Sequence, residues 1–138
     1  MPHLKSLDQS LEGFNKGDWD AYKSAYTDDC QYTEYATGRE IKSSDELLSN
    51  SQNWKNAFPN AHGQLINRID SGDCVVEEVI WSGTHDGELH TPDGKTIPPT
   101  HKSMKVHAIM VNRFRDEKIC ETKHYFDMLS MLKQLGLA

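Results

Sequence analysis

Residues 102–126, KSMKVHAIMVNRFRDEKICETKHYF, are the most informative segment for the architecture of this chain. Both of its halves are rich in Val, Ile and aromatic residues, a composition that favours strands over Lys102 to Arg115 and Lys118 to Phe126. Asp116 and Glu117 separate the halves, and two residues suffice for a tight hairpin. We therefore expect two long antiparallel strands here.

Further strands are expected outside this hairpin. Gln64 to Ile69 and Cys74 to His85 have the same strand-like composition, and Ser71-Gly72-Asp73 supplies turn residues between them. A shorter strand is expected from Cys30 to Tyr35. The second half of the chain therefore predicts a meander of four antiparallel strands.

The helical period appears in the first half of the chain and again at its end. One apolar stripe has steps of three and four residues: Leu4, Leu7, Leu11 and Phe14. Asp18 and Ser43 are N-cap candidates for two further helices, and a last amphipathic helix follows Asp127. This order predicts an α+β fold, in which a curved antiparallel sheet wraps on N-terminal helices plus a C-terminal helix. The open end of such a cone is a natural small-molecule pocket.

Size and charge restrict the classes of function. The 138 residues suit a single domain, 1–138, and no apolar run is long enough to span a membrane. The net charge of −6, with scattered basic residues, argues against a nucleic-acid partner. We expect a cytoplasmic protein because the N-terminus lacks the apolar stretch of a secretory signal.

Cysteine and histidine spacing gives no metal motif. The three cysteines stand far apart with no CxxC pair, so they are interpreted as buried thiols. The arm between two of the predicted strands carries His85, Asp86, His90 and His101, but turn residues lie between them and no HExxH spacing occurs. We expect neither a metal nor another cofactor.

Several short segments have the order and spacing of a known family. They are residues 15–18, 58–61, 83–87, 91–95 and 132–136, with Arg113-Phe114, Lys118-Ile119, Glu121 and Asp127 between the last two segments. Through them the chain resembles the SnoaL-like polyketide cyclases, a branch of the NTF2-like superfamily that includes ketosteroid isomerase and scytalone dehydratase. The resemblance covers nearly the whole chain. It implies a cone-shaped α+β barrel, a homodimer, and acid/base chemistry without a cofactor.

Asp127 is the first catalytic candidate. In the family that the chain resembles, an aspartate just before the terminal helix is the proposed acid/base of an intramolecular aldol closure. Aspartate is also a favoured N-cap, and Asp127 directly precedes an amphipathic helix. The two interpretations predict opposite shifts, because capping lowers the pKa of a carboxyl group and burial in an apolar pocket raises it. Both remain open at this point.

Strand alternation suggests which residues accompany Asp127. Glu121, Lys123 and Tyr125 share its face of the last strand. If the hairpin has two residues and a regular register, the same face gains four residues of the preceding strand: Val106, Ala108, Met110 and Asn112. This wall is predicted to bind substrate. Lys123 stands where family members often carry an aromatic residue, so it is expected to pair with a carboxylate, bind an anionic substrate or reach solvent.

His85 is the second catalytic candidate. It follows a long strand at the start of the arm, where its ring would overhang the cavity mouth, and imidazole donates or shuttles protons near neutral pH. Trp81 shares its face, and Trp54 of the third predicted helix adds a further substrate-binding side chain. If the last two strands pair in a regular register, His107 lies on the opposite face of the sheet from Asp127. A bulge would place both residues on the same face.

Two classes of function follow from these expectations. The first is a cofactor-independent enzyme that performs cyclisation, isomerisation or dehydration on a small hydrophobic or carbonyl-containing molecule. The second is a non-catalytic binding or scaffold module that uses the same pocket or the outer face of the sheet.

Overall fold

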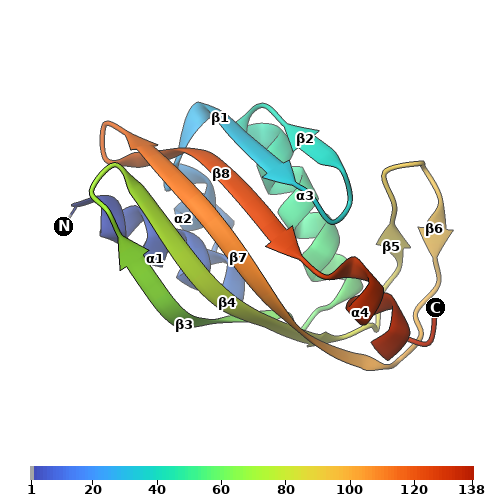
Figure 1. Ribbon diagram of the computed structural model, residues 1–138. Coiled ribbons are helices and arrows are strands. Elements are labelled where there is room, and N and C mark those ends of the chain that lie inside the picture. The colour runs from blue at the N-terminus through green and yellow to red at the C-terminus, as the bar shows by residue number, and fades with distance from the viewer. Residues whose placement is uncertain (1) are drawn as a thin grey trace.

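A computed structural model describes residues 2–138 as one curved sheet closed by helices (Figure 1). The helices are α1 (Pro2–Lys16), α2 (Trp19–Ser24), α3 (Ser44–Ala57) and α4 (Met128–Gln134). The strands of the main sheet are β1 (Tyr26–Glu34), β2 (Arg39–Ile41), β3 (His62–Asp70), β4 (Cys74–Thr84), β7 (Ser103–Arg115) and β8 (Lys118–Phe126). The arm forms a small separate hairpin of β5 (Leu89–His90) and β6 (Thr96–Ile97). The predicted α+β class and its cone-like arrangement are confirmed.

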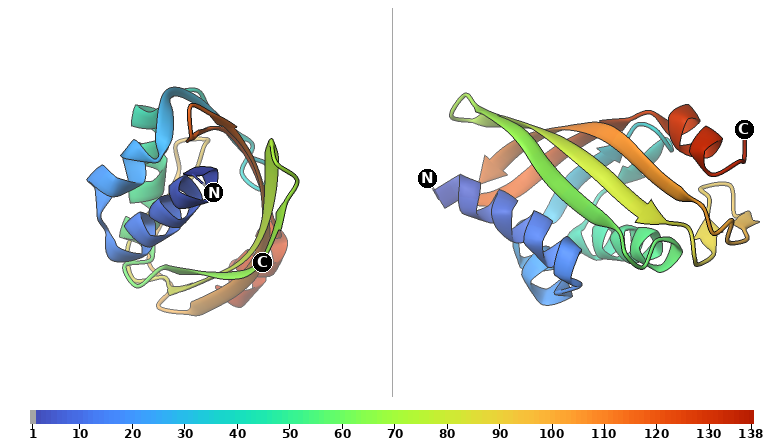
Figure 2. Two further views of the ribbon diagram at one scale, coloured as in Figure 1. Left: turned by 90° about the vertical axis from the view of Figure 1, so that its left-hand side faces the viewer. Right: turned by 90° about the horizontal axis from the view of Figure 1, so that it is seen from below.

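The main sheet has the order β2-β1-β8-β7-β4-β3. All its neighbouring strands are antiparallel except β1 and β8, which run parallel. The sheet bends so that its concave face looks toward α1, α2 and α3, as the view along the barrel shows (Figure 2). The core lies between these layers, and α4 with its C-cap adds the buried side chains of Met131 and Leu135 at one end.

Local sequence explains where the helices begin and end. The side chains of Asp18, Ser43 and Asp127 each accept a hydrogen bond from a backbone N–H in the first turn of α2, α3 and α4. Gly17 and Gly136, at φ values of 72° and 74°, follow α1 and α4 in the left-handed conformation that glycine tolerates. None of the helices in residues 2–138 is both long and apolar enough to cross a membrane.

The hairpin between β7 and β8 corrects one prediction. Asp116 and Glu117 form the expected two-residue turn with positive φ values, but a bulge follows it, because Arg113 pairs with Glu121 and Cys120 is left over. One extra residue exchanges the two faces of a strand relative to its neighbour. The prediction that Asn112 and Glu121 lie on the same face of the sheet is therefore wrong.

After the bulge, the inner face of β8 carries the other set of side chains. Asn112 pairs with Thr122, Met110 with His124, and Ala108 with Phe126. The bulge also brings the exposed side chain of His107 to the face of β8 that carries Tyr125, which is the outer face.

Candidate functional site

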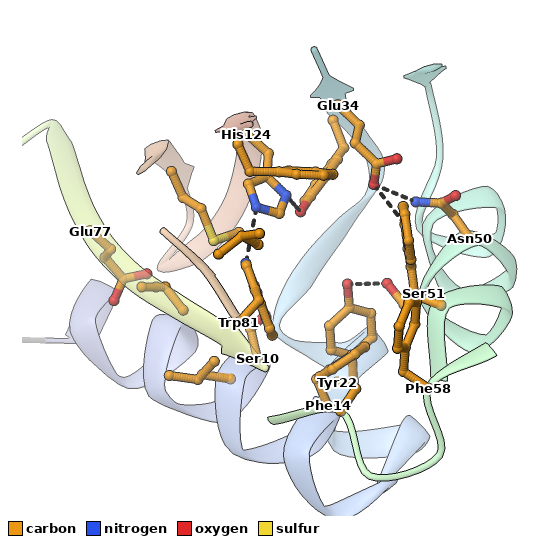
Figure 3. Close-up of a pocket in the computed structure, with 18 of the residues that line it drawn as sticks. Ser10, Phe14, Tyr22, Glu34, Asn50, Ser51, Phe58, Glu77, Trp81 and His124 are labelled. Atoms are coloured by element: carbon orange, nitrogen blue, oxygen red, sulfur yellow. Dashed lines mark hydrogen bonds between the residues drawn. The ribbon is translucent and has the colours of Figure 1, made fainter. Parts of the chain in front are cut away.

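A cavity lies between the concave face of the sheet and the helices (Figure 3). It encloses about 90 Å³, several times the roughly 10–15 Å³ that one water molecule needs. Most of its wall is apolar or aromatic, with a few polar groups, as is usual for small-molecule sites. Its lining includes Phe14, Tyr22, Tyr26, Tyr32, Glu34, Trp54, Phe58, Glu77, Trp81, Met110, Asn112, His124 and Phe126.

Strand register places three ionisable side chains in one row across the floor of the cavity. Glu77 of β4 pairs with Met110 of β7, Met110 pairs with His124 of β8, and His124 pairs with Glu34 of β1. All four residues line the cavity. Because neighbouring strands are about 4.8 Å apart, Glu77 and His124 stand about 10 Å apart at their backbones, with Met110 between them.

Glu34 is fully surrounded by donors. Its Oε1 accepts from Thr37 Oγ1 at 2.7 Å and Arg39 at 3.1 Å, and its Oε2 accepts from Asn50 Nδ2 and Trp54 Nε1, both at 3.0 Å. A carboxylate offers about four lone-pair positions, so these four bonds satisfy it. Glu34 is therefore a structural anion that joins β1 to α3, and it has no free lone pair with which to remove a proton.

Glu77 differs because only one of its oxygens is engaged. Oε2 accepts two hydrogen bonds from Arg68, at 2.8 and 3.1 Å, and Arg68 also binds Asp8 of α1. Oε1 accepts no hydrogen bond from any side chain or amide in residues 2–138. Burial raises the pKa of Glu77 above its usual value, although Arg68 opposes the change. Glu77 is thus a cavity-lining carboxyl group with a free oxygen and increased basicity.

His124 forms the centre of a hydrogen-bonded chain. Trp81 Nε1 donates to its Nε2 at 3.1 Å (Figure 3). Its Nδ1 lies 2.8 Å from the Tyr32 hydroxyl. Burial lowers the pKa of His124 to about 4, so the imidazole is neutral at physiological pH. Burial also keeps the pKa of Tyr32 well above its usual value, so its phenol stays protonated. The cavity therefore contains a neutral histidine bound to a phenolic hydroxyl.

Gly63 of β3 makes room for the indole in this chain. A Cβ atom on Gly63 would lie 2.6 Å from Trp81 Cζ3 and 2.7 Å from Leu11 Cδ1. We expect Gly63→Ala to push the rigid indole away from His124 and to destabilise the fold by about 1–3 kcal/mol, the usual cost of overpacking. Urea unfolding measures this loss, and near-UV circular dichroism reports the displaced indole. The matched control is His62→Ala at the exposed neighbouring position, and equal stability of the two variants would contradict the expectation.

Hydroxyl groups line the opposite, helical side. Tyr22 bonds to Ser51 of α3 at 2.6 Å, and Tyr26 bonds to Ser10 of α1 at 2.7 Å. Burial raises the pKa of Tyr22 to about 12 and that of Tyr26 well above its usual value. These phenols act as neutral hydrogen-bonding groups, which suits an oxygen-containing ligand with an apolar body.

The substrate-binding candidates divide into two groups. Four of them line the cavity: Trp54, Trp81, Met110 and Asn112. The other three, Glu121, Lys123 and Tyr125, do not line it. They lie on the outer face of β8, where Glu121 pairs with Arg113 and Tyr125 stacks on Tyr35 with ring centres 4.6 Å apart. The bulge at Cys120 is the reason, because it exchanges the faces of β8 beyond the turn.

Neither catalytic candidate lines the cavity. Asp127 is exposed, and its Oδ1 accepts from the Ser130 backbone N–H at 3.1 Å, so the structure gives it the capping contact. His85 is fully buried beneath the arm, where its Nδ1 accepts from the Thr100 backbone N–H at 3.2 Å and its ring stacks on Phe58. Its Nε2 has no partner in residues 2–138. Catalytic roles for Asp127 and His85 remain predictions that the cavity geometry does not support.

The main polar residues of the cavity were not among the predicted site residues. Tyr26, Tyr32 and Glu34 recur on the inner face of β1, and their alternation is visible in the sequence. Glu77 alternates with Val75 and Val79 on β4, so its burial could have been inferred from the same period. His124 could be found only by allowing for the bulge. No group of three or more metal-binding side chains gathers anywhere in residues 2–138.

Comparison with known proteins gives both a family and a fold. The sequence profile of the SnoaL-like polyketide cyclase family matches residues 5–135. No curated protein matches the chain in sequence. Among solved structures, a protein of Jannaschia described as a SnoaL-like polyketide cyclase aligns with a TM-score of 0.85 at 15% identity, covering 99% of this chain and 93% of that one.

Two further structures agree with this result. IdmH of Streptomyces antibioticus, described as a polyketide cyclase, gives a TM-score of 0.81 at 22% identity and covers 97% of this chain and 98% of its own. A Catenulispora acidiphila protein with a ketosteroid isomerase-like fold, in complex with trimethylamine, gives a TM-score of 0.80 at 19% identity. This alignment covers 96% of this chain and 93% of that one. At these identities the structures show a shared fold, and the profile shows the family. The chain belongs to the SnoaL-like polyketide cyclase family.

Proposed function

We propose that the protein binds a small, largely apolar carbonyl compound in this cavity and catalyses proton transfer on it without a cofactor, as in an aldol cyclisation or an isomerisation. One observation carries the proposal. A carboxyl group with a free oxygen, Glu77, and a protonated phenol, Tyr32, line the same apolar cavity. A base and a hydrogen-bond donor for the carbonyl oxygen are the two groups that enolisation requires.

The proposed reaction begins at the carbon next to the carbonyl group. Glu77 Oε1 takes a proton from this carbon, the electron pair of the broken C–H bond moves into the enolate, and the Tyr32 hydroxyl binds the enolate oxygen. In a cyclisation, the enolate carbon then forms a bond to a second carbonyl carbon of the same molecule. The resulting alkoxide takes the proton back from Glu77, so that no proton is gained or lost. In an isomerisation, the proton returns to a different carbon.

Hydrogen–deuterium exchange tests this chemistry before the natural substrate is known. Acetophenone in D₂O exchanges its methyl protons through the enolate, and proton NMR follows the rate. We expect wild-type protein to accelerate the exchange and Glu77→Gln to reduce this acceleration about 10²-fold, since the amide cannot accept the proton. Tyr32→Phe is expected to cause a loss of the same order, because one donor to the oxyanion is removed.

The matched control for the exchange experiment is Glu78→Gln. Glu78 is the next residue on β4, so its side chain points away from the cavity, where it accepts a hydrogen bond from Asn67. This variant should accelerate the deuterium exchange of acetophenone as much as wild type does. Equal rates in Glu77→Gln and wild type would remove Glu77 from the role of base.

A second function is a non-catalytic ligand-binding module. The observation that favours it is the double hydrogen bond from Arg68, which stabilises the ionised form of Glu77 and so weakens it as a base. Native mass spectrometry of the purified protein separates the two functions. A retained apolar ligand, together with no acceleration of exchange, would support the binding module. A homodimer and a cytoplasmic location remain predictions from the sequence.

A further inference from the structure

The hydrogen bonds around His124 have only one possible direction. An indole N–H is a donor and never an acceptor, so the contact between Trp81 Nε1 and His124 Nε2 requires a lone pair on Nε2. In a neutral imidazole the proton then resides on Nδ1. Nδ1–H therefore donates to the oxygen of Tyr32, 2.8 Å away. Trp81 thus selects the tautomer of His124.

This tautomer determines where the Tyr32 proton points. Because its oxygen accepts from His124, the hydroxyl cannot return its own proton to that nitrogen. Among residues 2–138, this hydroxyl makes no hydrogen bond other than the one with His124. The nearest carboxylate in the row across the sheet, Glu34, already has its oxygens occupied by Thr37, Arg39, Asn50 and Trp54. The Tyr32 hydroxyl therefore retains one unused donor, on a side chain that lines the cavity.

We propose that Trp81 and His124 are positioning residues that orient the Tyr32 proton into the cavity, and that the site consequently selects ligands presenting an acceptor oxygen. This inference rests on the proposed function, because it names the ligand group that the same cavity recognises. The reverse arrangement, with the proton on His124 Nε2, would let Tyr32 donate to Nδ1 and leave only its lone pair for a ligand. That site would favour a ligand hydroxyl or amine. The indole of Trp81 decides between the two.

The arrangement also explains how an apolar cavity could bind an anionic oxygen without a nearby cation. The Arg68 and Arg39 guanidinium groups are each paired with a buried carboxylate, Glu77 and Glu34. A phenol that already accepts from an imidazole is a stronger donor, because hydrogen bonds in a chain polarise one another. The ligand class is therefore a ketone, an enolate or a related acceptor with an apolar body.

The first experiment needs no ligand. Nitrogen-15 NMR of the His124 ring distinguishes a protonated nitrogen from one with a free lone pair, and wild-type protein should show a proton on Nδ1 and none on Nε2. Trp81→Phe keeps an aromatic wall but removes the donor, so Nε2 should carry the proton in a substantial part of the molecules. A wild-type spectrum with the proton on Nε2 would overturn the inference whatever the ligands do.

The second experiment compares two ligands of the same shape. Acetophenone and α-methylstyrene differ only by a carbonyl oxygen in place of a methylene group, so their affinity ratio measures the hydrogen bond. We expect wild type to prefer acetophenone by about two- to tenfold, the usual net value of one hydrogen bond. Trp81→Phe and Tyr32→Phe should each abolish this preference, so that the ratio of the two affinities is about 1. His124→Gln should retain it, because an amide can accept from Trp81 and donate to Tyr32.

The outcomes separate this inference from the proposed function. Retention of the ketone preference in a folded Trp81→Phe would overturn the inference, and if that variant does not fold, retention in Tyr32→Phe would do so. Failure of wild type to bind either ligand would overturn the ligand class together with the proposed function. Preferential binding of acetophenone without accelerated deuterium exchange would support the inference and remove only the catalytic function.

Discussion

Replacing Glu34 with alanine is expected to destabilise the fold by about 3–5 kcal/mol, the usual cost of breaking a buried ion pair from one side. The Glu34 side chain is only 3% exposed and accepts four hydrogen bonds, including one from the Arg39 guanidinium. Its removal leaves Asn50 and Trp54 with unpaired donors in the cavity wall, and it leaves Arg39 without its carboxylate. The loss therefore combines a partly buried cation that has lost its carboxylate with several unsatisfied neutral groups.

Urea-induced unfolding measures this loss. The matched control is Glu40→Ala, which removes the same side chain from an exposed position on β2 and should change stability by about 0.5 kcal/mol or less. The stability of Glu34→Gln should lie between those of Glu34→Ala and Glu40→Ala. The amide oxygen of this variant replaces one acceptor, whereas its NH₂ group faces existing donors. If Glu34→Ala were as stable as Glu40→Ala, the anchoring role of Glu34 would be wrong.

The sequence predicts the strands of this fold well because their composition is a local property. The β7–β8 hairpin is an example, since the aromatic and β-branched residues on both sides of Asp116 and Glu117 determine both strands and the turn. The N-caps of the helices are equally local, and Asp18 and Ser43 cap α2 and α3 as predicted. Local chemistry was therefore sufficient for the four strands of the meander and for the α+β class. It was not sufficient for β1, which begins at Tyr26 rather than at Cys30, or for the short strands β2, β5 and β6, which were not predicted.

The register of β8 could not be predicted in the same way, because it depends on two neighbouring strands at once. Cys120 bulges between Ile119 and Glu121, at the place where β1 also shifts its register between Tyr26 and Gln31. No residue in this segment is a signal for a bulge by itself. The prediction was consequently right for the inner face of β7 and wrong for β8, and it missed His124.

The two interpretations of Asp127 show a different limit. A carboxyl group before an amphipathic helix is an equally good cap and acid/base candidate in sequence, and only the position of the cavity separates them. The structure gives Asp127 a backbone partner at Ser130 and an exposed side chain, while Glu77 lines the cavity. The site residues could not be identified without the three-dimensional sheet, because pairing between strands that are distant in the chain brings them together.

Acidification is expected to destabilise the protein through His124. Burial lowers the pKa of this histidine from 6.5 to about 4 in the folded state. Between these two values the unfolded chain binds a proton that the folded protein does not bind, so stability falls as pH decreases from about 6.5 to about 4. At about 1.4 kcal/mol per pH unit, the contribution of His124 to this loss is about 3 kcal/mol.

The measurement is the free energy of unfolding from pH 7 to pH 4, compared between wild type and His124→Gln. Glu77 acts in the opposite direction, because its raised pKa lets the folded state take up a proton first, and buried His85, whose pKa is also lowered, acts in the same direction as His124. Both groups remain in the variant, so their contributions largely cancel in the difference. The variant should lose about 3 kcal/mol less than wild type over this range. Parallel pH profiles would show that His124 is protonated without cost, which is incompatible with an Nε2 lone pair that accepts from Trp81.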